Sequence, residues 1–150
     1  MKIKKNIPLF VTLGLIFCSL IISIILFYHA NYGKKFVFIF PSVEEGNYVL
    51  ETRYLKNNPE KDYLNYFVDE LVLGSSLERT KNLFTAGTKV LSCFERNDVV
   101  YIDLSADIIN MGDNVLEIKD GIDLLKKNII KNYPGTKEIR VFVDGKYAFE

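Results

Sequence analysis

"KVLSCFERNDVVYIDLSADI", residues 89–108, carries the pattern that decides the fold. Two runs rich in β-forming residues, KVLSCFE and DVVYIDLS, are separated by Arg96 and Asn97, which predicts a β-hairpin with a tight turn. Side chains alternate between the two faces of a strand, so one face of the second run is apolar and carries Val100, Ile102 and Leu104. Asp103 therefore points to the opposite face.

The segments before this hairpin predict two strands and a helix. The continuously apolar FVFIF, residues 36–40, suits a strand buried on both faces, and YVLETRYL, residues 48–55, is a weaker strand. Asn58 is a suitable cap for a following helix, with Pro59 and Glu60 in its first turn, and Gly74 ends that helix. Its apolar positions have helical spacing: Leu64, Phe67, Val68 and Leu71.

After the hairpin, the sequence predicts a second helix over residues 115–132 and a last strand in EIRVFVDG. Pro134 and Gly135 terminate the helix, and Gly121 in its middle indicates a close approach of this helix to the sheet. The order of elements is β-β-α-β-β-α-β. The predicted fold class is therefore α+β, with a mixed β-sheet packed with two helices and preceded by one transmembrane helix.

A transmembrane anchor is predicted for residues 7–28, which hold no acidic or basic side chain. Twenty-two residues of helix span roughly 33 Å, enough to cross a hydrocarbon core of about 30 Å. Two alternatives stay open. A cleaved signal peptide would normally end in small residues, and lipidation at Cys18 would normally need a small residue where Phe17 stands.

The lysines on either side of this segment predict its orientation. Three of them crowd residues 1–6, which we expect to be a cytoplasmic basic tail of a single-pass inner-membrane protein. Residues 29–35 form a juxtamembrane linker, and residues 36–150 form an extracytoplasmic, periplasmic domain. That domain holds 14 basic and 19 acidic residues, a net charge of −5, which argues against a nucleic-acid partner.

The predicted domain lacks the residues that most enzyme mechanisms and metal sites require. His29, the only histidine of the chain, abuts the anchor, where an interfacial position is expected. Cys93 is the only cysteine outside the anchor and suits a packed apolar position. Ser/His or Cys/His nucleophile pairs, histidine-based metal sites and cysteine-based zinc sites are thereby excluded. We expect no catalytic residues, no metal and no cofactor, and the sequence indicates no particular ligand-binding residue.

One enzymatic alternative needs only carboxylates. Asp103 and Asp107, with Glu70, could serve as acid and base on a glycan. The competing interpretation is structural, because Asp and Ser at a strand end commonly accept hydrogen bonds from the backbone of the next turn. Tyr63 and Tyr66 are expected to lie in or near the core, or to join a partner surface.

Three blocks of the sequence, taken in order, resemble the GerMN (sporulation and spore germination) domain family. They are YFVDELVLG, AGTKVLSCFERNDVVYIDLSADI and NYPGTKEIRVFVDGK. The resemblance covers residues 36–148, and departs from the family pattern in loops, at GSS (residues 74–76) and FTAGT (residues 84–88). It implies a small, membrane-tethered, extracytoplasmic domain without catalytic residues.

The expected function is therefore that of a non-catalytic module of the bacterial cell envelope. It would act through protein–protein interaction or envelope assembly of the sporulation and germination type, with envelope proteins or further copies of itself as partners. Association through sheet edges is one route to such contacts. The alternative is a peptidoglycan-binding or glycan-cleaving domain that uses Asp103 and Asp107.

Overall fold

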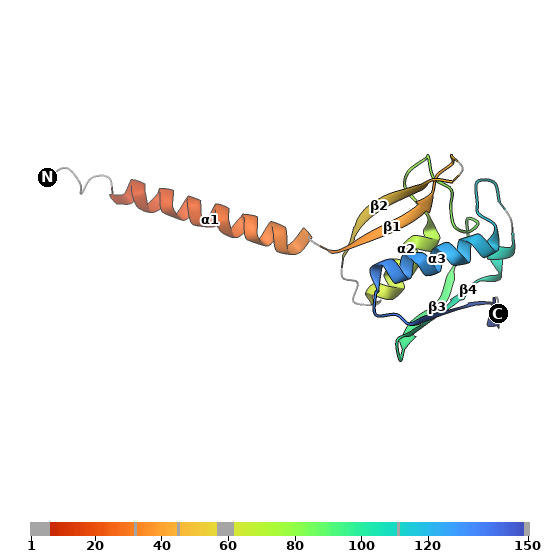
Figure 1. The fold of residues 1–150 in the computed structure, drawn as a ribbon. Helices are drawn as coiled ribbons and strands as arrows, with labels where there is room; N and C mark the ends of the chain where they lie inside the picture. Colours follow the sequence, from red (N-terminus) through yellow and green to blue (C-terminus); the bar gives the residue numbers. More distant parts are fainter. Residues whose placement is uncertain (1–6, 32, 45, 57–61, 111, 149–150) are drawn as a thin grey trace. The chain divides into compact units, whose positions relative to one another are not determined.

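Figure 1 shows a computed structural model of the chain, which describes residues 7–31, 33–44, 46–56, 62–110 and 112–148. The chain divides into two units, Met1–Gly33 and Lys34–Glu150. The expected helix start at residues 58–60 lies outside the described residues, and so does the basic tail. The two units are described separately below.

The first unit is one helix, α1 (Ile7–Asn31). Its segment Pro8–Tyr28 is long and apolar enough to cross a membrane, and its side chains are exposed rather than packed against protein. A helix that is apolar on all sides needs an apolar surrounding to bury its surface. The backbone of His29 belongs to this helix, whereas its side chain lies outside the described part.

The second unit contains two sheets. Strands β1 (Lys34–Pro41) and β2 (Tyr48–Leu55) pair antiparallel as a separate two-stranded sheet. The other sheet has four strands in the order β3-β4-β5-β6, whose bounds are Val90–Arg96, Val99–Leu104, Glu138–Val143 and Lys146–Tyr147. It is mixed, because β4 and β5 run parallel and the other pairs run antiparallel.

Helices α2 (Tyr63–Leu73) and α3 (Ile118–Asn132) lie between the two sheets (Figure 1). The side chain of Asp62 caps α2 by accepting a hydrogen bond from the Asn65 N–H, and Gly74 ends it as predicted. The start of α3 was predicted three residues too early. Val115 instead forms a parallel bridge with Asn82, which holds residues before Ile118 outside the helix.

The core fills the space between the helices and the two sheets. On β1 the aromatic side chains of Phe36, Phe38 and Phe40 are buried. Phe36 and Phe38 pack against Phe67 of α2, and Phe40 stacks on Phe38. The apolar face predicted for β4 is confirmed, because all three of its residues are fully buried. Fully buried side chains from the helices complete this core: Val68, Leu71, Leu125 and Ile129.

The turns between strands depend on residues that tolerate positive φ. The β3–β4 turn was predicted over Arg96 and Asn97, and this is wrong by one residue. The turn consists of Asn97 (φ 55°) and Asp98 (φ 63°), while Arg96 is the last residue of β3. Asn and Asp adopt the left-handed region more readily than Arg, which explains the shift.

The first residue of β1 is held by aromatic rings. The Lys34 ammonium nitrogen lies 5.3 Å from the ring centroids of Phe36 and Tyr133 and 5.5 Å from that of Tyr63. Cation–π attraction at such distances is worth about 0.5–1 kcal/mol per exposed pair. The start of β1 is thereby attached to α2 and to the residue that follows α3.

Two asparagines of α3 occupy the edge of β1 that faces away from β2. The Asn128 amide accepts from the Ile39 N–H (2.7 Å) and donates to the Ile39 carbonyl (2.9 Å). Asn132, one helical turn later, makes the same two bonds with Val37, at 2.9 and 2.8 Å. Residues i and i+4 of a helix lie on one face, and residues i and i+2 of a strand share one edge, so the two spacings match.

The predicted α+β class is confirmed, including an apolar helix before the domain. The sequence did not indicate that the strands divide into two sheets. Gly121 does mark a close approach, although to a loop rather than to a sheet: a Cβ there would lie 2.5 Å from the Leu83 carbonyl oxygen.

Replacing Asn128 with leucine tests the attachment of β1 to α3. Leucine has a similar size but leaves the Ile39 N–H and carbonyl without partners, so the free energy of unfolding should fall by about 2–4 kcal/mol. Urea denaturation measures this change. Lys131→Leu, at an exposed position of the same helix, is the control. Equal midpoints for Asn128→Leu and the parent would show that the amide pairing contributes nothing.

Candidate functional site

Asp103, the first carboxylate of the candidate acid/base pair, stabilises a turn. It lies half-buried on the solvent side of β4, and its Oδ1 accepts a hydrogen bond from the Gly145 N–H at 3.1 Å. Gly145 and Asp144 form the turn between β5 and β6, both with positive φ. The carboxylate therefore attaches this turn to the neighbouring strand.

Asp107 belongs to a different local network. Its Oδ2 accepts from the Ser105 hydroxyl at 2.9 Å, and the Ser105 oxygen accepts from the Lys89 N–H at 3.0 Å. Ser105 precedes the short 3-10 helix Ala106–Ile109. These bonds connect the start of β3 to the end of β4. The arrangement matches the structural interpretation of DLSAD.

Glu70, the third carboxylate considered for catalysis, belongs to a partly buried ion-pair network instead. Its Oε2 lies 3.0 Å from Nη1 of Arg53, and Nε of Arg53 lies 2.8 Å from Oε1 of Glu51. Arg53 also donates to the Gly74 carbonyl at 2.7 Å, and its guanidinium lies over the rings of Phe38 and Phe40. The network ties β2 to the end of α2.

Glu51 is the most perturbed carboxylate of this network. Burial alone would raise its pKa, but hydrogen bonds from Arg53, Ser75 and Ser76 outweigh that effect and lower the pKa to about 2. Its environment is thus one that holds a permanent negative charge. A general acid or base needs a pKa nearer to neutrality, so Glu51 is suited to stability rather than proton transfer.

Cys93, the thiol of the domain, is poorly suited to nucleophilic chemistry. Cys93 is buried, and burial, aided by the negative charges of Asp62 and Asp69, raises the pKa of its thiol to about 12. A thiol with such a pKa is a poor nucleophile near neutral pH. Within the described ranges, no three side chains of His, Cys, Asp or Glu converge as metal ligands.

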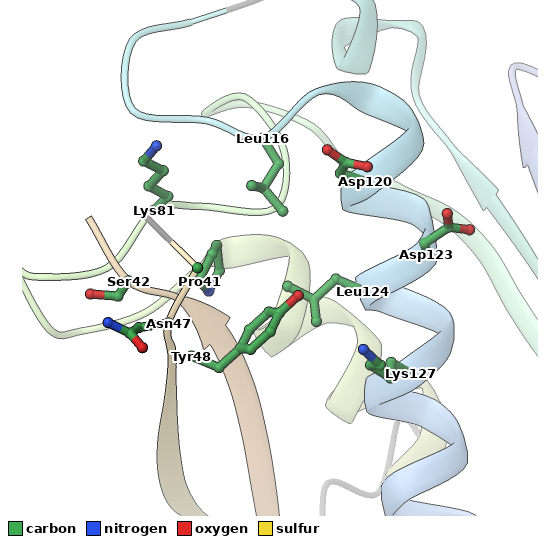
Figure 2. Close-up of a pocket in the computed structure, with 11 residues that line it drawn as sticks. Pro41, Ser42, Asn47, Tyr48, Lys81, Leu116, Asp120, Asp123, Leu124 and Lys127 are labelled. Carbon is green, nitrogen blue, oxygen red and sulfur yellow. The ribbon is translucent and has the colours of Figure 1, made fainter. Parts of the chain in front are cut away.

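An open pocket of about 390 Å³ lies where the β1–β2 turn meets the first half of α3. Figure 2 shows Tyr48 extending from the start of β2 toward α3, from which Asp120, Asp123 and Lys127 project. The Lys127 ammonium lies 5.4 Å from the centroid of the Tyr48 ring, which is 58% exposed. Polar and apolar residues complete the lining: Pro41, Ser42, Gly46, Asn47, Lys81, Leu116 and Leu124.

The pocket is lined by two acidic and two basic side chains, so its formal net charge is zero. Asp120 and Asp123 form no hydrogen bond or ion pair with any described residue, so both carboxylates can bind a ligand. Lys81 and Lys127 balance them. A neutral lining with one exposed aromatic ring suits polar, uncharged groups better than phosphates.

A second exposed feature covers the solvent side of the four-stranded sheet. Phe94 and Tyr101 stack with centroids 5.1 Å apart, and Arg140 lies over Tyr101 at 5.7 Å. On the next row, Phe142 meets Tyr147 edge-on at 5.4 Å. We call these five residues the aromatic face. Phe94 and Tyr147 are 49% and 46% exposed, although their size would favour burial.

Sequence reasoning identified neither the pocket nor the aromatic face. Asp120, Asp123 and Lys127 have helical spacing and mark the polar side of α3, but nothing in the sequence places Tyr48 opposite them. Tyr63 and Tyr66, named as candidate partner residues, are partly buried against the core. The exposed aromatic residues come instead from strand positions that alternate with core positions.

Comparison with known proteins identifies relatives of the domain. Residues 28–148 match the family described as Germane: sporulation and spore germination. An uncharacterized lipoprotein of Treponema pallidum (strain Nichols) is 23% identical over 105 residues, which are 70% of this chain and 78% of the relative.

Two solved structures from Bacillus subtilis have a similar fold. The tandem GerMN domains of the sporulation protein GerM align with a TM-score of 0.55 and 21% identity, over 77% of this chain and 40% of that one. The first GerMN domain of GerM aligns with a TM-score of 0.55 and 12% identity, over 74% and 84%. This chain thus spans less than half of the tandem structure.

The lowered pKa of Glu51 predicts a specific dependence of stability on pH. Because the folded-state pKa lies below the ordinary value of 4.5, ionised Glu51 stabilises the fold above pH 4.5, and this contribution is lost as the pH falls toward 2. Allowing for solvent screening, it should amount to about 1–2 kcal/mol. Urea unfolding of the parent and of Glu51→Gln should differ clearly at pH 7 and much less at pH 3.

Glu44→Gln, which removes an exposed carboxylate near the β1–β2 turn, is the matched control. A difference between the parent and Glu51→Gln that is as large at pH 3 as at pH 7 would contradict the assignment.

Proposed function

Because the chain belongs to the Germane family of sporulation and spore germination domains, we propose that it is a membrane-anchored envelope module that works through protein contacts. It catalyses no reaction in this proposal. The membrane helix holds the domain outside the cytoplasm, where it contacts other envelope proteins. The observation that carries the proposal is the aromatic face on the outer side of the four-stranded sheet.

The composition of the aromatic face supports a protein partner. Tyrosine, phenylalanine and arginine are enriched in protein–protein interfaces, and all five residues of this face are of these types. Their rings already contact one another, so binding would immobilise few additional rotamers. Asp103 and the β5–β6 turn hold Phe142 and Tyr147 in place.

The carboxylates supply no reason to assign catalysis. Asp103, Asp107 and Glu70 each have a partner within the fold, at a turn, a strand junction and an ion pair respectively. A glycosidase needs two carboxyl groups facing one substrate across a cleft. The proposal therefore keeps these residues as structural.

The anchor is proposed to remain attached as a helix that spans the inner membrane once. Its length and its uninterrupted apolar composition support this role. The relative from Treponema pallidum is named a lipoprotein, so lipidation at Cys18 is the alternative mode of attachment. In this chain the apolar helix continues well past Cys18 to Tyr28, whereas lipidation would cleave it there.

A second candidate function is binding to the glycan of peptidoglycan, and the open pocket favours it. Sugar rings are neutral and carry many hydroxyl groups, which match paired carboxylates, ammonium groups and the amide of Asn47. The exposed ring of Tyr48 offers a flat apolar surface for a sugar face. This candidate binds glycan without cleaving it.

The mode of anchoring is tested by Cys18→Ser. If the intact helix is the anchor, this variant should stay in the membrane fraction at the parental level, with the N-terminal peptide present in its mass spectrum. A phosphatase reporter fused after Glu150 should be active only if the domain is extracytoplasmic. Release of Cys18→Ser into the soluble fraction, or an inactive phosphatase, would overturn the proposed anchoring.

Two reciprocal double variants distinguish the function of the aromatic face from that of the pocket. Phe94→Ser combined with Tyr147→Ser should reduce the capture of cross-linked envelope proteins at least tenfold and leave sedimentation with isolated peptidoglycan unchanged. If the pocket binds glycan, Tyr48→Ala combined with Asp123→Asn should reduce sedimentation with peptidoglycan and leave the capture of envelope proteins unchanged. Each double variant is the control for the other, because all four positions are on the surface.

Thermal unfolding and circular dichroism establish that both double variants are folded. The protein-contact proposal fails if the aromatic-face variant captures partners as well as the parent does. The glycan candidate fails if neither the parent nor the pocket variant sediments with peptidoglycan.

A further inference from the structure

The two edges of the β1–β2 sheet differ in their hydrogen-bond partners. The edge formed by β1 is occupied by the amides of Asn128 and Asn132. At the edge formed by β2, no strand within the described ranges pairs, and no described backbone group outside the hairpin bonds to Leu50 or Thr52. Exposed edges promote strand addition, and proteins usually protect them with charges or proline.

The hydrogen-bonding groups of Leu50 and Thr52 point outward along this edge. In the hairpin, Leu50 lies opposite Ile39 and Thr52 opposite Val37. Ile39 and Val37 direct their N–H groups to the asparagines, so these pairs exchange no hydrogen bonds across the hairpin. Leu50 and Thr52 therefore direct their own N–H and carbonyl groups away from β1.

The side chains of β2 lack the usual edge protection. Its exposed positions hold no charge and no proline, and Leu50 is 63% exposed. The charged side chains Glu51 and Arg53 point inward, to the network with Glu70. The edge therefore presents a neutral and partly apolar surface to another strand.

We infer that β2 pairs antiparallel with β2 of a second copy of the chain, about a twofold axis at Thr52. This register is self-complementary: Thr52 meets Thr52, and Leu50 meets Tyr54 of the other copy. On the inner face Glu51 lies opposite Arg53 of the other copy, so opposite charges face one another and like charges do not. Twofold symmetry is the most common arrangement of homo-oligomers.

The inference deepens the proposed function by naming a second copy as one partner, and it rests on the premise that the module works through contacts. It uses a surface other than the aromatic face. The two can therefore fail independently: the pairing is measured at β2, and the capture of other proteins is measured with the Phe94 and Tyr147 variants.

Cysteine cross-linking in the full-length chain tests the register. In a Cys18→Ser background, Thr52→Cys should form a disulfide-linked dimer on mild oxidation in membranes, because directly paired Cα atoms lie about 5.5 Å apart and disulfides span about 4.4–6.8 Å. Leu50→Cys should not link to itself, because the two copies of position 50 lie about 13 Å apart along the strands. The buried Cys93 stays in place.

A mixture of Leu50→Cys and Tyr54→Cys chains should cross-link between the two variants. Equal linking of Thr52→Cys and Leu50→Cys with themselves would indicate random collision and overturn the inference, as would no linking at position 52.

Thr52→Pro provides a second measurement. Proline is tolerated where an N–H points away from the partner strand, so the hairpin should persist while the outer edge loses a donor. Light scattering in detergent should then give half the parental protein mass, with Thr52→Val as the dimeric control. The same mass for the parent and Thr52→Pro would refute the pairing. If Thr52→Pro does not fold, the cross-linking pattern of the cysteine variants at positions 50, 52 and 54 tests the pairing instead.

Discussion

The attachment of β1 to α3 by two asparagine amides is the interaction on which the rest of the domain depends. The amides of Asn128 and Asn132 make the hydrogen bonds to β1 that a third strand would otherwise make, and Asn128 is completely buried. Because β1 is paired on both edges, its row of phenylalanines faces the helices in one orientation, which seals the core against α2. The two-stranded sheet would otherwise be too small to be stable alone.

This attachment also explains how one small domain has two distinct outer surfaces. The helices cover the inner faces of both sheets, so the outer faces remain available. On the four-stranded sheet the outer face is aromatic, and between the β1–β2 turn and the first half of α3 there is an open pocket. The side chains that first suggested catalysis are used within the fold, at turns and at one ion-pair network. In the proposed function these side chains are structural, and the outer surfaces make the contacts.

Local patterns were sufficient to predict most elements but not how they meet. Alternation predicted the buried face of β4, and helical spacing predicted α2, because both depend on neighbours along the chain. The separation into two sheets depends on Asn128 and Asn132, whose partners lie 89 and 95 residues away. Tyr48 contacts α3 through Lys127, which is likewise far away in the sequence. Such pairings leave no periodic signal, so the pocket could not be predicted from the sequence.

The position of β1 in the chain has a mechanical consequence. Strand β1 begins at Lys34, three residues after the apolar helix ends at Asn31. In the proposed function, tension between the membrane and a bound partner enters the domain through β1, which is bonded along both edges and whose Lys34 lies against the rings of Tyr63 and Tyr133. Pulling along this strand loads both rows of hydrogen bonds together. A force on the proposed tether would thus be shared by several hydrogen bonds instead of acting on one at a time.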